Sequence, residues 1–120
     1  MHGDDLKKRT KAFASAIIRL YCSLPRQRTE VRILSDQMLR SGTSVAANYR
    51  EASRPRSNPD FISKTEICIQ EADETQLWLE LLRDDCGINH DKLDWLLQES
   101  GELIAIFVTM VKKVKNRISK

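Results

Sequence analysis

A chain of 120 residues with 41% hydrophobic and 31% charged side chains has the length and composition of one soluble globular domain. It contains no apolar run near the ~18 residues that a membrane span requires, and its first ten residues lack the hydrophobic stretch of a secretory signal. Its three cysteines (Cys22, Cys68 and Cys86) form no C-x-x-C pair and are typical of small buried side chains in a reducing compartment. We therefore expect a cytoplasmic protein without a membrane association.

The net charge of +3 hides an alternation of basic and acidic segments along the chain. Residues 26–56 contain seven arginines and three acids, and residues 60–85 contain eight acids and two basic residues. Residues 111–120 then hold five basic residues and no acid. Two interpretations remain open. Neighbouring helices or subunits neutralise one another, or the basic segments bind an anionic polymer.

The first predicted helix covers about residues 5–23 and is stopped by Pro25. Apolar side chains recur there at steps of three and four residues, as they do on one face of a helix. The stripe consists of Leu6, Thr10, Phe13, Ile17, Leu20 and Leu24.

The second predicted helix covers about residues 28–53 and has a weak middle. Its stripe consists of Val31, Leu34, Met38, Ser41, Val45, Asn48 and Ala52. Residues 41–44 (Ser-Gly-Thr-Ser) are poor helix formers, and a mid-helix glycine costs ~1 kcal/mol relative to alanine. We expect an unbroken helix whose small residues let a neighbouring helix approach closely, with a kink at 41–44 as the alternative. Asn48 either fixes register or oligomeric state from a buried position, or simply bonds a neighbouring backbone or hydroxyl group.

The third predicted helix covers about residues 59–85, with Asn58 as N-cap, Pro59 at the first position and Gly87 after the end. Its stripe consists of Phe61, Thr65, Cys68, Ala72, Thr75, Leu79, Leu82 and Cys86. The fourth covers about residues 90–117, with Asn89 or Asp91 as cap. Its stripe consists of Leu93, Leu97, Ser100, Ile104, Phe107, Val111, Val114 and Ile118.

These four stripes predict an all-α protein, and no segment shows the two-residue alternation of a strand. Short connections favour an antiparallel, up-down-up-down, left-handed four-helix bundle formed by residues 1–120 as a single domain. The third and fourth helices also carry more apolar side chains than one seam uses, which predicts a homo-oligomer. We expect Trp78, Leu81 and Trp95 at its interface; the alternative places the tryptophans in the core or singly exposed.

The sequence lacks the residues that most enzymes and metal proteins require. The only histidines are His2 and His90, no acid precedes either by three residues, and no cysteine pair has zinc-ligand spacing. No glycine-rich phosphate loop and no catalytic triad is visible. We therefore expect a non-enzymatic protein without a metal or cofactor. A small-molecule site would rest on Asn48, Glu51 and Glu71 alone.

Two basic clusters instead predict binding of structured RNA or DNA. They consist of Arg50, Arg54 and Arg56 near the end of the second helix, and Lys112, Lys113, Lys115 and Arg117 in the C-terminal segment. Such side chains bind phosphate in a salt-dependent way, and the aromatic content of 6% argues against base stacking as the main mode. The alternatives are that Arg40 and Arg50 pair with acids of the third helix, and that the basic C-terminus is a solvated helix end. A protein-interaction hub without nucleic-acid affinity is the second functional hypothesis.

From about Phe13 to Ile118 the chain also resembles the 23S rRNA-intervening sequence protein family. These are small bacterial four-helix-bundle proteins, often encoded in insertions within ribosomal RNA genes or elsewhere in the genome. The residues that carry the resemblance are Gln37, Arg40, the run "SVAAN" with Ser44 and Asn48, Glu51, Arg56, Ser57, Asp60 and Phe61. The family is similar in fold to the accessory variability protein of diversity-generating retroelements. The resemblance therefore implies a homopentamer that binds nucleic acid or a protein such as a reverse transcriptase. One position departs from the family, because Ala52 stands where a glycine commonly follows the glutamate, and we expect the second helix to continue about one turn further.

Overall fold

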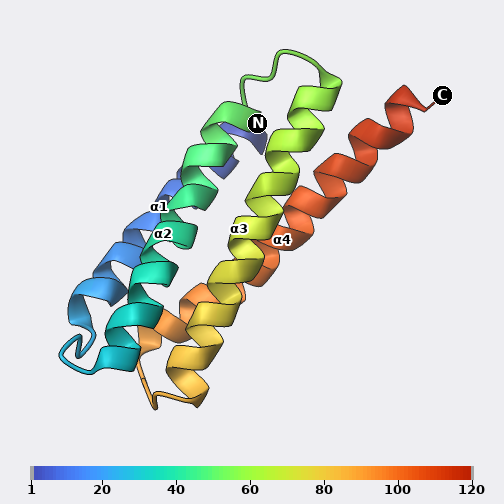
Figure 1. Cartoon of the computed structure of the whole chain (residues 1–120). Helices are drawn as coiled ribbons and strands as arrows, with labels where there is room; N and C mark the ends of the chain where they lie inside the picture. Colours follow the sequence, from blue (N-terminus) through green and yellow to red (C-terminus); the bar gives the residue numbers. More distant parts are fainter. Residues whose placement is uncertain (1, 120) are drawn as a thin grey trace.

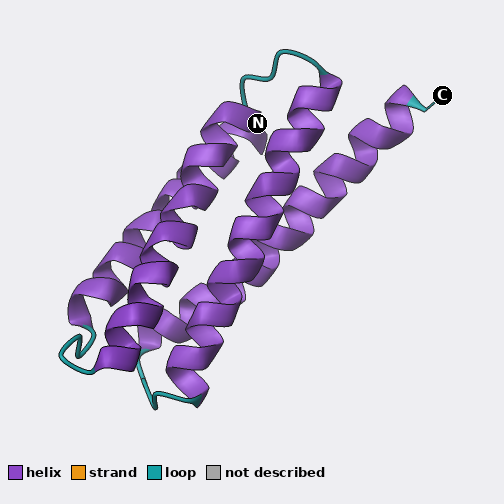
Figure 2. Cartoon of the chain, in the orientation of Figure 1, coloured by secondary structure: helices purple, strands orange, loops and turns teal. Residues whose placement is uncertain are grey.

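The computed structural model describes residues 2–119, with side chains described from residue 5 onward. Four helices make up this range, α1 (His2–Ser23), α2 (Thr29–Ala52), α3 (Asn58–Asp84) and α4 (Asp91–Ile118), and no strand occurs in it. They pack into an elongated bundle of 53 × 22 × 20 Å. The connections lie at alternate ends of the bundle (Figure 1), and everything between them is helical (Figure 2). The all-α class and the four-helix bundle are confirmed, whereas the left-handed packing stays a prediction. No helix among the described residues is long and apolar enough to cross a membrane.

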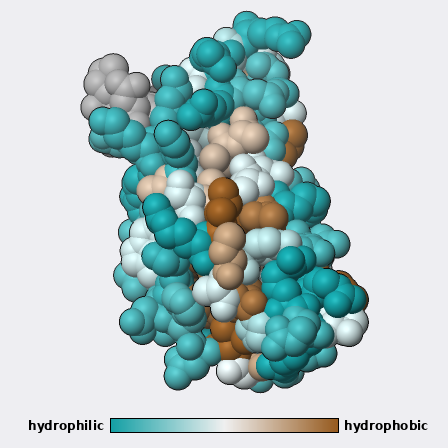
Figure 3. All heavy atoms as spheres, turned by 90° about the vertical axis from the view of Figure 1, so that its left-hand side faces the viewer, coloured by the Kyte–Doolittle hydropathy of each residue, from teal (hydrophilic) through white to brown (hydrophobic). Residues whose placement is uncertain are grey.

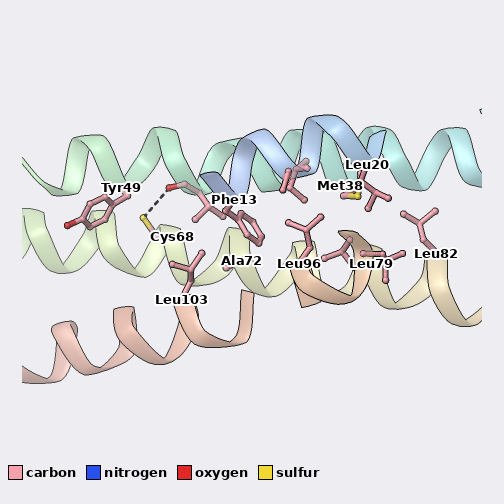
Figure 4. Packing of buried hydrophobic residues seen from close by; sticks show 14 of the residues in the cluster. Phe13, Leu20, Met38, Tyr49, Cys68, Ala72, Leu79, Leu82, Leu96 and Leu103 are labelled. Carbon is pink, nitrogen blue, oxygen red and sulfur yellow. Dashed lines mark hydrogen bonds between the residues drawn. The ribbon is translucent and has the colours of Figure 1, made fainter. Parts of the chain in front are cut away.

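The stripes predicted for α1 and α3 form much of the hydrophobic core. Every predicted position of the α1 stripe, from Leu6 to Leu24, is buried, and so is the α3 stripe from Thr65 to Cys86. Phe61 is only partly buried. Figure 4 shows side chains from different helices meeting along the bundle axis, among them Phe13, Leu96 and Leu103. The three-and-four spacing therefore identified the inward faces of these two helices correctly.

The stripes of α2 and α4 are offset in part from the predicted positions. In α2, Ser35 and Tyr49 are fully or almost fully buried, whereas Leu34 and Asn48 are only partly buried. In α4, Leu93, Ser100, Phe107, Val111 and Val114 are buried as predicted. Leu96 and Leu103 are buried where Leu97 and Ile104 were expected, and Ile118 is 49% exposed. A helix of a four-helix bundle contacts two neighbours and buries a stripe wider than one heptad seam, so the position beside the seam can become the deepest one.

Two of the three predicted helix caps were misplaced by one residue. The N-cap of α3 is Ser57, whose hydroxyl accepts the backbone N–H of Asp60 at 3.1 Å, while the Asp60 carboxylate accepts the backbone N–H of Arg56 at 3.1 Å. The arrangement resembles a capping box, but the return bond from Asp60 reaches the residue before the N-cap. At α4 the cap is His90, whose Nδ1 accepts the backbone N–H of Lys92 at 3.0 Å. Gly87 adopts φ +71° after α3, which confirms its predicted role as terminator.

The middle of α2 is continuous helix, as predicted. A Cβ atom placed on Gly42 would lie 2.7 Å from Ile17 Cγ1 of α1, closer than real side chains approach. On the other side, Ser41 Oγ lies 2.8 Å from Thr75 Oγ1 of α3. The small residues therefore allow both neighbouring helices to pack closely against α2, and this packing offsets the poor helix propensity.

α2 nevertheless ends at Ala52, not one turn later as expected. The backbone N–H of Ser53 bonds the Tyr49 carbonyl at 2.9 Å, and that of Arg54 bonds the Glu51 carbonyl at 3.1 Å, which closes the last turn. Arg54 also precedes Pro55, and a residue before proline is disfavoured in the helical region. The chain turns here without the glycine.

The cysteines divide into two kinds. Cys68 and Cys86 are buried as predicted, but Cys22 is exposed, because it lies off the α1 stripe between Leu20 and Leu24. Burial raises the pKa of Cys68 to about 12.

Candidate nucleic-acid interface

The structure brings the two predicted basic clusters to the same end of the bundle. The connection between α2 and α3, the first turns of α1 and the C-terminal end of α4 all lie at this end (Figure 1). Arg54 and Arg56 belong to that connection, and Arg50 to the last turn of α2. About sixty residues of sequence separate the clusters, but the connections at alternate ends of the bundle bring both clusters to the same end (Figure 1). We call this region the basic end.

The side chains of the basic end are exposed and mostly unpaired. All seven predicted residues, Arg50, Arg54, Arg56, Lys112, Lys113, Lys115 and Arg117, are exposed. Lys115 Nζ lies 3.3 Å from Glu66 Oε2 of α3. Within residues 5–119, the other six make no ion pair. Their charges are therefore available to an anionic ligand.

Three acids at this end, Glu51, Asp60 and Glu66, are already engaged with other groups. The Glu51 carboxylate accepts a hydrogen bond from Lys64 Nζ at 2.6 Å, and this bond raises the pKa of Lys64. The nearby positive charge of Arg56 slightly opposes that rise in the pKa of Lys64. Asp60 is occupied by the backbone of Arg56. The basic character of this end therefore persists in the folded chain.

Arg40 behaves differently from Arg50. Its guanidinium lies 3.3 Å from Glu71 Oε2 and 3.1 Å from Glu74 Oε1, both on α3. The alternative that Arg40 pairs with acids of the third helix is confirmed. For Arg50 that alternative is wrong among the described residues, where it has no ion pair.

One basic wall of this end was missing from the predicted site. Lys8 of α1 lines the same groove as Lys113 and Arg117 of α4. Lys8, Lys11 and Arg19 also share a surface along α1. The excess of basic residues in the first 25 positions was the available signal, but no spacing rule related them to the C-terminal cluster.

Most of the motif residues have structural roles. Ser44 Oγ donates to the Arg40 carbonyl at 2.7 Å, and Asn48 Nδ2 donates to the Ser44 carbonyl at 2.8 Å, both within α2. Asn48 therefore makes the plain backbone contact that was one of its two predicted roles, and it is not a buried core residue. Ser57 caps α3. Gln37 is exposed, and no contact among residues 5–119 explains its place in the motif.

No small-molecule or metal site is assembled from the remaining candidates. Asn48, Glu51 and Glu71 each bond a different partner, namely Ser44, Lys64 and Arg40. Among the described residues, no group of three or more His, Cys, Asp or Glu side chains is placed to hold a metal ion. The His2 side chain lies outside the described residues.

The predicted interface residues occupy different environments. Trp78 is partly buried and packs against the core, with an indole N–H that is buried without a hydrogen-bond partner among the described residues. Leu81 is also partly buried, and Trp95 is 47% exposed. Exposed apolar side chains also occur on α1 and α2, where Ile18 and Ile33 are 46% and 55% exposed. Figure 3 shows a narrow apolar strip between hydrophilic flanks on the side formed by these helices. The interface stays a prediction.

Comparisons with known proteins relate the sequence to a protein family and the fold to a solved structure. The sequence model of the family described as 23S rRNA-intervening sequence protein matches residues 5–109. The chain is also similar to a crystal structure of a protein with unknown function from the S23 ribosomal protein family of Bacteroides thetaiotaomicron VPI-5482. The two are 37% identical, the match covers 88% of this chain and 97% of that one, and the TM-score is 0.80. No curated protein matches the sequence.

Proposed function

The chain belongs to the 23S rRNA-intervening sequence protein family, and on this premise we propose that it is a non-enzymatic, oligomeric scaffold that binds structured RNA or DNA through its basic end. The observation that carries the proposal is the convergence of six exposed cations on one end of the bundle, none of which forms an ion pair with a described residue. Phosphate groups are the natural partners of such a surface, because binding releases condensed counterions from the nucleic acid.

The kind of recognition follows from the side chains available. Lysine and arginine contacts to phosphate set position and affinity but carry no base information directly. Aromatic residues make up only 6% of the chain, and Tyr49 and Phe107 are in the core. We therefore expect recognition of backbone shape, with little preference for base sequence.

An oligomer would multiply this surface. The proposed assembly is a homopentamer, as the likeness in fold to the accessory variability protein of diversity-generating retroelements implies. When one basic end of such an assembly has bound a nucleic acid, the other basic ends are held close to the same molecule. The overall affinity rises in this way without any new kind of contact. Size-exclusion chromatography with light scattering measures the number of subunits, and a monomeric mass at working concentration would remove this part of the proposal.

The test is a fluorescence-anisotropy titration of a labelled hairpin RNA and a DNA duplex. A protein making 6–10 phosphate contacts loses roughly 10³–10⁵ in affinity between about 50 and 200 mM salt. Replacing Lys112, Lys113, Lys115 and Arg117 with Gln should abolish most of the binding. The matched control removes the same charge from the opposite end by replacing Arg19, Arg32, Arg83 and Lys92 with Gln, and should retain the affinity. Equal loss in both variants, or no binding at low salt, would contradict the proposal.

The second candidate function is a hub that docks a partner protein, such as a reverse transcriptase, without intrinsic nucleic-acid affinity. An apolar groove beside the basic end favours this second function, because an apolar surface contributes nothing to phosphate binding but can bind apolar side chains of a protein. In that case the four-residue Gln variant changes nucleic-acid binding little, since there is none to lose.

A further inference from the structure

α1 and α4 close against each other around one ion-paired cluster. Arg9 of α1 donates to Glu99 of α4 twice, from Nη2 to Oε1 at 2.7 Å and from Nε to Oε2 at 3.0 Å, and reaches Glu102 Oε1 at 3.2 Å. Glu99 is only 8% exposed. From Arg9 toward the two chain ends, a groove of about 990 Å³ lies between the helices, and Phe61 of α3 also lines it. Figure 1 shows α4 diverging from its neighbours toward its C-terminus. We call this space the α1–α4 groove.

The floor of the α1–α4 groove is apolar. Ile106, Met110 and Val114 follow one another at four-residue spacing along α4, so they form one row on its surface. Leu6 and Phe61 complete the floor from α1 and α3. The lining part of α4 extends from Ala105 to Arg117, about 18 Å at 1.5 Å per residue, or roughly three helical turns.

The rim of the groove is basic. Lys8 stands on the α1 side, and Lys113 and Arg117 stand on the α4 side. None of these three has an ion pair within residues 5–119. Among the described side chains, Asp5 is the one acid in the lining, and Arg9 is already paired with Glu99 and Glu102. An occupant must therefore combine an apolar face with acidic edges.

We propose that the α1–α4 groove binds an acidic amphipathic helix of a partner protein. A helix of three turns matches the length of the floor, and its apolar residues at i, i+4 and i+7 would fill the space over Ile106, Met110 and Phe61. Its aspartate or glutamate side chains would meet Lys8 on one side and Lys113 or Arg117 on the other, which sets orientation and speeds association. The unbranched Met110 side chain can adapt to the anchor residues.

Other occupants fit these features less well. Nucleic acid would place a charged backbone over an apolar floor and leave that floor without a partner. A single-chain anionic amphiphile carries one charge at one end, whereas the cations stand on both walls. The volume is also at the upper limit of small-molecule sites, which span ~300–1,000 Å³.

The proposed docking site shares residues with the proposed nucleic-acid surface. Lys113 and Arg117 belong to both, whereas Arg54 and Arg56 belong only to the latter. A docked acidic helix would neutralise the shared cations and weaken nucleic-acid binding at the same end. Because Arg54 and Arg56 lie outside the groove, charge reversal at Arg54 and Arg56 can be compared with charge reversal at Lys113 and Arg117 to distinguish the two proposals.

The experiment uses the full chain and a labelled peptide of about 14 residues, with leucines at i, i+4, i+7 and i+11 and glutamates beside them. A peptide of the same composition with the leucines spread around the helix is the control. We expect saturable anisotropy with the patterned peptide and perturbed methyl NMR signals of Ile106 and Met110. The Lys113→Glu/Arg117→Glu variant should weaken binding at least about tenfold. The Arg54→Glu/Arg56→Glu variant changes the charge equally and should stay within about twofold.

Each other result would overturn the proposal. Equal binding of the control peptide, or equal loss in the two variants, would mean charge attraction without a helix site. No saturation below about 1 mM would mean that the groove takes no such helix. Saturation by oleate but not by the peptide would assign the groove to a small amphiphile. Perturbation of Ile106 and Met110 on raising the protein concentration alone would assign it to a second copy. Nucleic-acid affinity is measured separately and should fall in both charge variants.

Discussion

The contacts of α2 and the contact between α1 and α4 use different kinds of side chain. α2 presents Gly42 to Ile17 of α1 and Ser41 to Thr75 of α3. Because these side chains are small, α1 and α3 approach α2 closely, and the Ser41 hydroxyl bonds the Thr75 hydroxyl. α4 presents Ile106, Met110 and Val114 toward α1, and the helices separate beyond the Arg9 ion pair. The small side chains of α2 let its neighbours pack directly against it. The larger side chains of α4 meet no matching row of apolar side chains on α1, so a groove remains between these two helices. The closed seams serve the fold, and the open one is available for binding.

The largest expected difference between the closed α2–α3 contact and the exposed surface of the bundle is in the reactivity of their thiols. Cys68 lies between α2 and α3, with Sγ 3.9 Å from the Val45 carbonyl (Figure 4), and desolvation raises its pKa to about 12 from an ordinary value of 9.0. The thiolate is the reactive form, so below pH 9 its fraction at Cys68 is lower by roughly a thousandfold, at a factor of ten per pKa unit. Native-state alkylation followed by mass spectrometry should modify exposed Cys22 and spare Cys68. Rapid labelling of Cys68 would show that the α2–α3 seam opens.

The next largest difference is expected between alanine substitutions at two helical glycines, one packed against a neighbouring helix and one with open space beside it. Alanine at either site gains ~1 kcal/mol of helix propensity. At Gly42 the new Cβ would overlap the buried Ile17 side chain at 2.7 Å, and we expect a net loss of about 2 kcal/mol in the free energy of unfolding. At Gly101 the nearest atom is Gln76 Nε2 at 3.5 Å, so Gly101→Ala should stabilise by about 1 kcal/mol. Urea denaturation measures both, and equal shifts would mean that Ile17 yields freely.

The smallest difference concerns the ion pair at the closed end of the groove. Glu99→Gln removes the charge that Arg9 binds, and we expect a loss of about 1 kcal/mol, modest because the Arg9 side chain is 36% exposed. Glu66→Gln removes an exposed carboxylate from the solvated Lys115 pair and should leave the urea midpoint unchanged. If both variants behave alike, Arg9 and Glu99 do not hold α1 to α4.

Local chemistry made much of this molecule readable in advance. The spacing of Leu6 to Leu24 and of Thr65 to Cys86 identified two buried faces, and Pro25 and Gly87 marked two helix ends. The continuity of α2 was also predictable, because a run of small residues has a packing reason even where its propensity is poor. The burial of Tyr49 in place of Asn48 could not be predicted from the sequence, because it depends on how far α2 is rotated about its axis between its two neighbours.

The candidate site divides in the same way. The sequence by itself determined which residues carry charge, and Arg50, Arg54, Arg56 and the C-terminal lysines were recognised from composition alone. Only the tertiary structure decided which cations stay free. Arg40 is paired with Glu71 and Glu74, whereas Arg54 has no ion pair among the described residues, because pairing depends on where an acid of another helix lies. The α1–α4 groove has the same origin. Leu6, Phe61 and Met110 are ordinary stripe or flank positions in sequence, and they line one space because three helices meet there.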